Sequence, residues 1–396
     1  MTTSSKPPSG FLVLVLGYSC SAYGNYLNLV ALALYTLEVT GGPLGVGIVM
    51  ALRLAAGFCA GLVAGRLVNR FDRRRLMIAT DLAQASAMVV LAVSAEAFSV
   101  LVAAALVLGA GNTLFTVALR SSVPEMVGAD ARVRANGLLV SGRACGTVLG
   151  FASAGLVVAF GGYAAAFWLN AASFLVSAAA LSLVRLRTRA EAATVDGSRP
   201  RLSLLSAFGP VLGFMIVVRG GDAFGSASHN MALPLYANQL DAVHPAFVMS
   251  QFWASWAVGT LLAHQVVRRW TALGERAFAL GTCLMSVCFV LAFTGVTGPV
   301  LMAVALVAGL ADGFTEIVYT SRLQAAPDEL RGRLFGLSAT AETCGFAVGM
   351  LASSAVLEAL PALGVVALFH GVALAGAVGL LIALFVGGRT AAPATR

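Results

Sequence analysis

The stretch RVRANGLLVSGRACGTVLG (132–150) recurs without a gap in the second half of the chain as RGRLFGLSATAETCGFAVG (331–349). Two arginines, three glycines and a cysteine match at one offset. In chain order these are Arg132, Arg134, Gly137, Cys145, Gly146 and Gly150, against Arg331, Arg333, Gly336, Cys344, Gly345 and Gly349. So many identities at one offset indicate an internal duplication rather than shared composition.

Hydropathy places both copies in a membrane. Of the 396 residues 59% are hydrophobic and 11% are charged, and the mean hydropathy is +0.90, which leaves too little polar surface for a soluble globule. Apolar runs of about 20 residues suit helices that cross about 30 Å of hydrocarbon, whereas barrel strands are shorter and alternate. We expect an all-α integral membrane protein with twelve transmembrane helices, at 11–37, 43–68, 75–94, 98–120, 132–160, 163–185, 206–237, 245–269, 276–295, 298–322, 333–359 and 362–387.

The charges give the topology. Arginines crowd alternate loops between the predicted spans, and the loops between them carry no Lys or Arg. This is the positive-inside pattern, and it predicts a multi-pass protein with both termini in the cytoplasm. The net charge of +8 is therefore explained by topology, and we expect no nucleic-acid partner.

The longest polar segment divides the chain in two. RLRTRAEAATVDGSRPRLS (185–203) has the composition of a linker. We expect an N-terminal six-helix bundle over 1–185, a cytoplasmic linker over 186–205 and a C-terminal six-helix bundle over 206–396. Two duplicated bundles that rock about a site near the middle of the membrane are typical of secondary transporters.

The loop after the second predicted span carries a family resemblance. GRLVNRFDRR (65–74) resembles the Gly-x-x-x-Asp-Arg-x-Gly-Arg-Arg/Lys loop of the major facilitator superfamily, with Asn69 in place of the Asp and Asp72 in place of the second Gly. The segment 121–181 is similar to bacterial exporters that include siderophore and macrolide efflux pumps. The resemblance covers essentially the whole chain, and it implies the fold of this superfamily and a place in the bacterial plasma (inner) membrane.

In that family the loop latches the two halves together on the cytoplasmic side. The resemblance implies the same gate here, formed by Gly65, Asn69, Arg70, Asp72, Arg73, Arg74 and Asp81. Asn69 keeps an oxygen acceptor but lacks the charge, which Asp72 or Asp81 could supply. The alternative, that these arginines serve only topology, stays open.

Polar residues recur at helical spacing on the first, fourth, seventh and tenth predicted spans, the four that line the central cavity in the family's arrangement. A polar stripe that faced lipid would be costly, so a watery cavity explains it better. The candidates for contact with a small-molecule substrate are Tyr18, Ser21, Asn25, Asn28, Asn112, Thr113, Thr116, Arg219, Ser226, His229 and Tyr319.

Ionisable residues within spans point to proton coupling, because a charge at the centre of a span costs about 2.5–3.5 kcal/mol on insertion scales. Asp312 and Glu316 are four residues apart and repel each other if both are ionised, so they need a partner or a shared proton. With Asp222 and Glu342 they are our candidates for coupling transport to protons. Substrate contact and a structural role, such as an Arg219–Asp222 pair, remain alternatives.

Three further charges lie on long helices where the halves meet in the family. Arg53 is on the second predicted span, Arg143 on the fifth and Glu342 on the eleventh, and the repeat makes Arg143 and Glu342 equivalents of opposite charge. The family packs the second helix against the eleventh, which implies an Arg53–Glu342 bridge. Such a bridge would either break and re-form during transport or be static.

Motifs for other chemistries are missing from the sequence. It contains no P-loop, no His-Glu-x-x-His and no Gly-x-Ser-x-Gly, its six cysteines lack the spacing of a metal site, and its four histidines are dispersed. We therefore expect no nucleotide, no cofactor, no metal and no enzyme. Glycines spaced by four at 57, 61 and 65 and at 142, 146 and 150 are expected to allow close helix packing.

These features together predict a secondary active transporter that works by alternating access. We expect it to export an amphipathic small molecule, such as a drug, an antibiotic or another natural product, in exchange for protons. An importer or uniporter of a small metabolite, a non-transporting receptor or scaffold, and a membrane enzyme are the alternatives.

Overall fold

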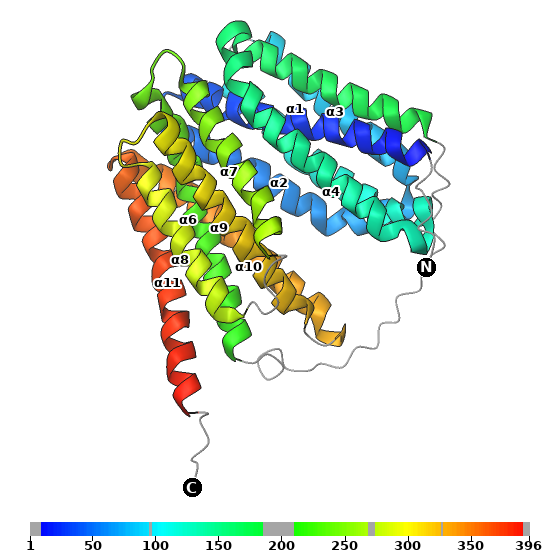
Figure 1. Ribbon diagram of the computed structural model, residues 1–396. Coiled ribbons are helices and arrows are strands. Elements are labelled where there is room, and N and C mark those ends of the chain that lie inside the picture. The colour runs from blue at the N-terminus through cyan, green and yellow to red at the C-terminus, as the bar shows by residue number, and fades with distance from the viewer. Residues whose placement is uncertain (1–8, 95–96, 185–209, 268–273, 326–327, 391–396) are drawn as a thin grey trace. The chain divides into compact units, whose positions relative to one another are not determined.

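A computed structural model describes residues 9–94, 97–184, 210–267, 274–325 and 328–390. Within these ranges every regular element is a helix (Figure 1), which confirms the predicted all-helical class. The helices are α1 (Ser9–Thr40), α2 (Pro43–Arg70), α3 (Arg73–Val93), α4 (Phe98–Leu183), α6 (Pro210–Leu240), α7 (Pro245–Val267), α8 (Glu275–Ala292), α9 (Gly298–Gln324), α10 (Asp328–Leu357) and α11 (Ala362–Thr390).

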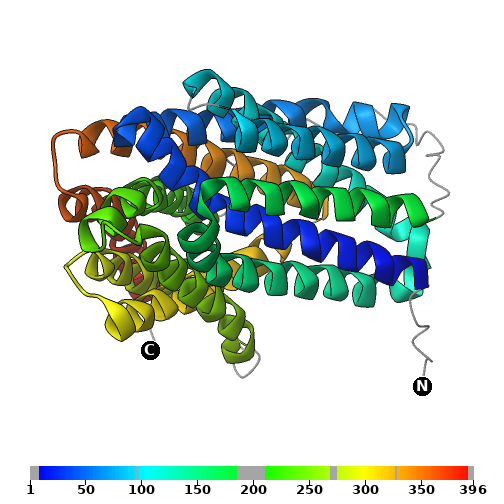
Figure 2. The ribbon, with the colours of Figure 1, turned by 90° about the horizontal axis from the view of Figure 1, so that it is seen from above.

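The helices follow the predicted spans closely, with one difference. Two predicted spans, 98–120 and 132–160, and all but the last two residues of a third, 163–185, fall within α4, which has 86 residues. α4 is not one straight rod, and Figure 2 shows the cyan-to-green part of the chain as several helical segments. Within α4, Gly162 has a φ of 67°, a left-handed conformation that suits a residue without a Cβ. In the described ranges nine segments are long and apolar enough to cross a membrane. Twelve crossings remain a prediction.

The described residues form two compact units. The first consists of the described residues up to 184 together with 241–250, and the second of 210–240 and 251–390. Each has its own apolar core: Phe11, Met77 and Phe115 are buried in the first, and Phe278 and Leu334 in the second. The predicted linker over 186–205 lies outside the described residues, and the predicted domain bounds remain a prediction.

Glycines set how α4 packs on α1 in the first unit. A Cβ placed on Gly146 would lie 2.7 Å from the backbone oxygen of Ser19 and 2.9 Å from the backbone nitrogen of Tyr23. One turn later, a Cβ on Gly150 would lie 2.5 Å from the backbone oxygen of Tyr23. The helices approach so closely that only a hydrogen fits at these two positions, as the glycine spacing predicts.

The second unit repeats this packing. A Cβ on Gly345 would meet the backbone of Gly220 and lie 3.4 Å from the nitrogen of Phe224, and a Cβ on Gly349 would lie 2.5 Å from the oxygen of Phe224. α10 thus packs on α6 in the register that α4 adopts on α1. The duplication seen in sequence is a duplication of helix packing, in which Tyr18 corresponds to Arg219 and Ser21 to Asp222.

This packing predicts a stability effect at Gly146. We expect Gly146→Ala to lower the midpoint of thermal unfolding in detergent, because the new methyl group collides with backbone atoms that cannot rotate away, and overpacking costs about 1–3 kcal/mol. Gly137→Ala, on the same helix, is the matched control, since a Cβ there meets nothing within 4 Å and alanine favours a helix. Equal midpoints for the two variants would contradict the packing argument.

Candidate functional site

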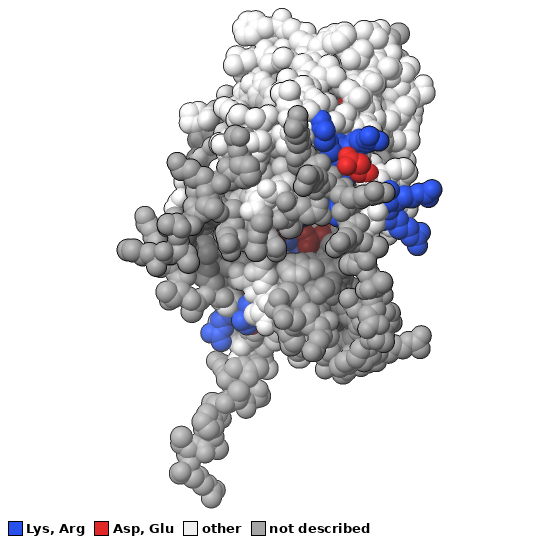
Figure 3. Space-filling view, turned by 90° about the vertical axis from the view of Figure 1, so that its right-hand side faces the viewer, with Lys and Arg blue, Asp and Glu red and all other residues white. Residues whose placement is uncertain are grey.

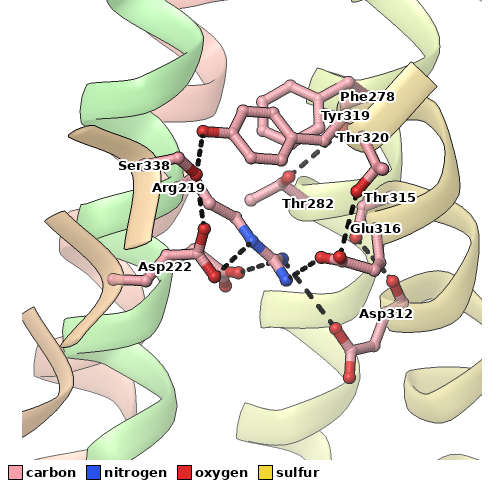
Figure 4. Close-up of polar contacts among 11 residues, drawn as sticks. Arg219, Asp222, Phe278, Thr282, Asp312, Thr315, Glu316, Tyr319, Thr320 and Ser338 are labelled. Atoms are coloured by element: carbon pink, nitrogen blue, oxygen red, sulfur yellow. Dashed lines mark hydrogen bonds and ion pairs between the residues drawn. The ribbon is translucent and has the colours of Figure 1, made fainter. Parts of the chain in front are cut away.

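Four carboxyl groups surround the guanidinium of Arg219 in the second unit (Figure 4). On α6, Asp222 Oδ2 lies 3.1 Å from Nη1. On α9, Asp312 Oδ1 lies 4.0 Å from Nη1 and Glu316 Oε2 lies 2.5 Å from Nη2. On α10, Glu342 Oε2 lies 3.6 Å from Nε. The Arg219 side chain is only 13% exposed, so this acidic cluster is organised around a largely buried cation.

Helical spacing explains half of this geometry. Arg219 and Asp222 are three residues apart on α6, and Asp312 and Glu316 are four apart on α9, so each pair shares a face. The Arg219–Asp222 pair, which the sequence left open as one alternative, is present. The partner that the α9 carboxyls need is Arg219, which the sequence did not identify because the contact joins two helices.

Hydroxyl groups extend the acidic cluster (Figure 4). The Tyr319 ring lies 5.9 Å from the Arg219 guanidinium carbon, and its hydroxyl donates to Ser338 Oγ at 2.7 Å. Ser338 in turn donates to Glu342 Oε1 at 2.7 Å. Sequence reasoning missed Ser338, although it lies one helical turn before Glu342 on α10. The two hydrogen bonds connect a residue on α9 to a carboxylate on α10.

The cluster holds more acid than base. Arginine keeps its proton in proteins, so one positive charge faces four carboxyl groups. Asp222 Oδ1 is buried and has no hydrogen-bond partner among the described residues. Buried anions without compensation are costly, and like-charged neighbours favour protonation. The arrangement can therefore bind and release protons as one coupled group.

A separate cavity of about 320 Å³ lies within the first unit. Six of the residues predicted to contact substrate line this cavity. Two of the three charges predicted at the interface of the halves and one residue predicted for the gate line it as well. In that order the residues are Tyr18, Ser21, Asn25, Asn112, Thr113, Thr116, Arg53, Arg143 and Asp81. Tyr26 and Gln84 also line the cavity and were not predicted. Their signal was present, since Tyr26 lies eight residues, about two turns, beyond Tyr18, and Gln84 lies three residues beyond Asp81.

Other predicted substrate contacts lie elsewhere. Asn28 is 0% exposed and is not among the residues that line the cavity. His229 is buried, and its Nδ1 lies 3.0 Å from His370 Nε2. The His229 ring stacks on Phe289 with centroids 3.7 Å apart. Two histidines that looked isolated in sequence therefore form a pair. Ser226 is half-buried on α6, and its carbonyl accepts a hydrogen bond from Asn230 at 2.9 Å.

The predicted Arg53–Glu342 bridge remains a prediction, because its two residues belong to different units. Within its own unit, Glu342 lies against Arg219. Arg53 lines the cavity, and its Nη1 has no hydrogen-bond partner among the described residues.

The arginine-rich loop binds helix ends within the first unit. Arg73 donates to the carbonyl of Ser121 at 2.7 Å, and Arg74 donates to Leu181 at 2.8 Å and also to Ser182. These carbonyls belong to two different segments of α4. Topology is therefore not the only role of these arginines, since carbonyls near helix ends attract cations.

The rest of the predicted gate is more dispersed. Gly65, Asn69 and Arg70 are exposed. Figure 3 shows several Lys and Arg side chains on the face that it displays. Asp81 lies two turns into α3 and lines the cavity, so it is not part of the loop. A latch between the two units remains a prediction.

Asp72 has a defined role in this loop. Its Oδ1 accepts a hydrogen bond from the backbone nitrogen of Arg75 at 2.8 Å, which caps the start of α3. We expect Asp72→Ala to destabilise the protein by about 1 kcal/mol, and Asp72→Asn, which can still cap, to have a much smaller effect. Thermal unfolding of both variants tests this. A loss of stability as large for Asn as for Ala would show that charge, not capping, matters here.

Comparison with known proteins gives the family. The sequence profile described as Major Facilitator Superfamily matches residues 14–350, and a search of curated protein sequences gives no match. A solved structure of a mutant peptide transporter POT in complex with sulfate superposes with a TM-score of 0.75 at 17% identity, covering 98% of this chain and 96% of that one. A mutant of the nucleoside transporter NupG gives 0.71 at 16% identity, covering 94% and 99%. At such identities the structures show a shared fold, and the profile match over most of the chain shows the family. The chain belongs to the major facilitator superfamily.

Proposed function

We propose that this protein is a proton-coupled transporter of a small molecule that works by alternating access. The acidic cluster around Arg219 carries this proposal. A single guanidinium cannot neutralise four carboxylates, so the number of bound protons determines which carboxyl groups the guanidinium pairs with. A conformational change that alters the exposure of the cluster would then couple proton binding to transport.

The exposure of the four acids supports a route for the proton. The Glu316 side chain is 51% exposed, Glu342 34%, Asp312 25% and Asp222 6%. Glu316 is thus the most accessible acid and Asp222 the least. We place proton entry at Glu316 and the inner end of the route at Asp222, with Arg219 changing partners between them.

Export of an amphipathic molecule, such as a drug, an antibiotic or another natural product, is the direction we propose. Its support is the resemblance of residues 121–181 to bacterial exporters. We propose that the protein lies in a bacterial plasma membrane with both termini in the cytoplasm. Uptake is the second candidate, because the solved structures with the same fold include a nucleoside transporter and a peptide transporter.

Purified protein in liposomes with an imposed pH gradient tests this function. We expect the cationic dye ethidium or the anionic probe naphthalene-2-carboxylate to move against the proton gradient, and the flux to stop when nigericin collapses the gradient. Movement of the probe in the same direction as protons would favour uptake. Flux that ignores the gradient would refute proton coupling, and protein-free liposomes provide the background rate.

A further inference from the structure

The cavity in the first unit contains polar groups that its own residues do not satisfy. Asn25 Oδ1, Arg53 Nη1 and Gln84 Oε1 are buried and lack a hydrogen-bond partner among the described residues. Both Asp81 carboxylate oxygens are also without one at hydrogen-bond distance, although Ser177 lies near enough to influence that carboxyl group. Buried polar atoms are paired in most proteins. Their concentration around one cavity indicates a place where a polar ligand supplies the partners.

The second guanidinium of the cavity has a neutral partner. Arg143 donates to the Tyr26 hydroxyl from Nε at 3.3 Å and from Nη2 at 3.0 Å. A phenol orients the guanidinium but does not cancel its charge. Arg53 and Arg143 are thus two permanent cations, and among the described residues Asp81 is the only acidic one that lines the cavity. The balance of fixed charge in the cavity is positive.

Helix packing relates this cavity to the acidic cluster of the other unit. A Cβ on Gly109 of α4 would meet the backbone oxygen of Arg53, and a Cβ on Gly309 of α9 would meet that of Trp256. This shared packing makes Asn112 the counterpart of Asp312, and Thr116 the counterpart of Glu316.

Each of the five charged members of the acidic cluster therefore has a counterpart that lines the cavity. Asp222, Asp312 and Glu316 correspond to uncharged Ser21, Asn112 and Thr116, and the remaining pairs are Arg219 with Tyr18 and Glu342 with Arg143. The equivalent positions that carry acids in the second unit carry hydroxyls, an amide and a guanidinium in the first. The acidic cluster supplies the anions for its own cation, and the cavity leaves its cations available.

We propose that the cavity of the first unit binds an oxyanion, a carboxylate or a phosphate-type group, on the transported molecule, with Arg53 and Arg143 as its ligands. A guanidinium donates two parallel hydrogen bonds to such a group. Apolar lining from Leu29, Phe115 and Phe174 suits the body of an amphipathic organic anion. This inference rests on the proposed transport function and names the substrate class for it.

Binding measurements on the purified full-length chain in lipid nanodiscs test the proposal without transport. The probes are naphthalene-2-carboxylate, naphthalene-2-phosphonate and the neutral naphthalene-2-carboxamide. We expect both anions to bind at least tenfold more tightly than the amide. Arg53→Gln and Arg143→Gln are each expected to weaken the binding of the two anions at least tenfold and to leave the binding of the amide unchanged. The ratio of the two anions distinguishes a carboxylate site from a phosphate site.

Asp81→Asn is expected to raise the affinity for the anions, because Asp81 is the one acidic residue among the described residues that line the cavity. The matched control is Arg276→Gln, an exposed arginine of the other unit, which should change nothing. Equal binding of amide and anions by the unmodified protein, no binding of any probe, or weakening of amide and anion together by the arginine variants would overturn the proposal. Proton-driven flux of the cationic dye would survive that outcome, so the two proposals fail separately.

Discussion

Neutralising the two acids of α9 is expected to abolish proton-driven accumulation while the protein stays folded. Asp312→Asn and Glu316→Gln keep the shape of each side chain and remove its ability to exchange a proton. Because both acids contact Arg219, their loss also restricts the guanidinium to its two remaining carboxyl partners, Asp222 and Glu342. In liposomes we expect accumulation against a gradient to fall to the level of protein-free vesicles, a loss of about tenfold or more, in line with removal of an essential proton-transfer group. Exchange of probe at equal pH on both sides should continue.

Glu275→Gln is the matched control for these variants. Glu275 forms an ion pair with Arg322 in the same unit, outside the acidic cluster, so its loss removes a carboxylate without touching the proposed proton site. We expect its proton-driven accumulation to match that of the unmodified protein. If Asp312→Asn and Glu316→Gln both keep normal coupling, the α9 acids are not the proton site, and a comparable loss in Glu275→Gln would make any effect nonspecific.

The features that the sequence predicted correctly are those that depend on the period and composition of a single helix. Hydropathy placed the helices because each span must cover the hydrocarbon by itself. Spacing of three or four residues placed Asp222 beside Arg219, and Asp312 on the same face as Glu316. The glycine pattern of the repeat predicted close packing at Gly146. Each of these inferences needs only the period of the helix.

Contacts between helices were beyond this reasoning. Glu342 pairs with Arg219 across α10 and α6, and His229 meets His370 across α6 and α11, at separations of more than 100 residues along the chain. Helical period says which face a residue occupies but not which helix that face meets. Asp81 is a related case, because its sequence lies close to the arginine loop while two turns of α3 carry it about 12 Å from the start of that helix.

The position of each residue along α3 explains why the arginines of the loop and Asp81 have different surroundings. Arg73 and Arg74 begin α3 and reach carbonyls at the ends of neighbouring segments, whereas Asp81 reaches the same cavity as Arg53 and Arg143. One motif thus contributes to two places with different chemistry. A mutation in the loop should affect stability or gating, and a mutation at Asp81 should affect ligand binding.

Removing the cation of the acidic cluster is expected to have the largest effect on stability. Arg219→Gln leaves Asp222, Asp312, Glu316 and Glu342 without a positive charge among them, and deleting one partner of a buried ion pair costs about 3–5 kcal/mol. We expect transport to be lost and the midpoint of thermal unfolding to fall at pH 8. Because protonation of the carboxyl groups relieves their repulsion, the midpoint should recover at pH 5 by more than that of the unmodified protein.

The double variant Arg219→Gln/Asp222→Asn separates charge from packing. Removing one acid together with the cation reduces the repulsion, so part of the stability lost at pH 8 should return, while transport stays absent because the guanidinium is required for it. Arg276→Gln, which loses a guanidinium that lies 4.9 Å over the Phe385 ring, controls for the loss of an arginine elsewhere in the same unit. If Arg219→Gln unfolds at the same temperature at pH 5 and pH 8, and the double variant regains nothing, the four acids do not share their protons through this cation.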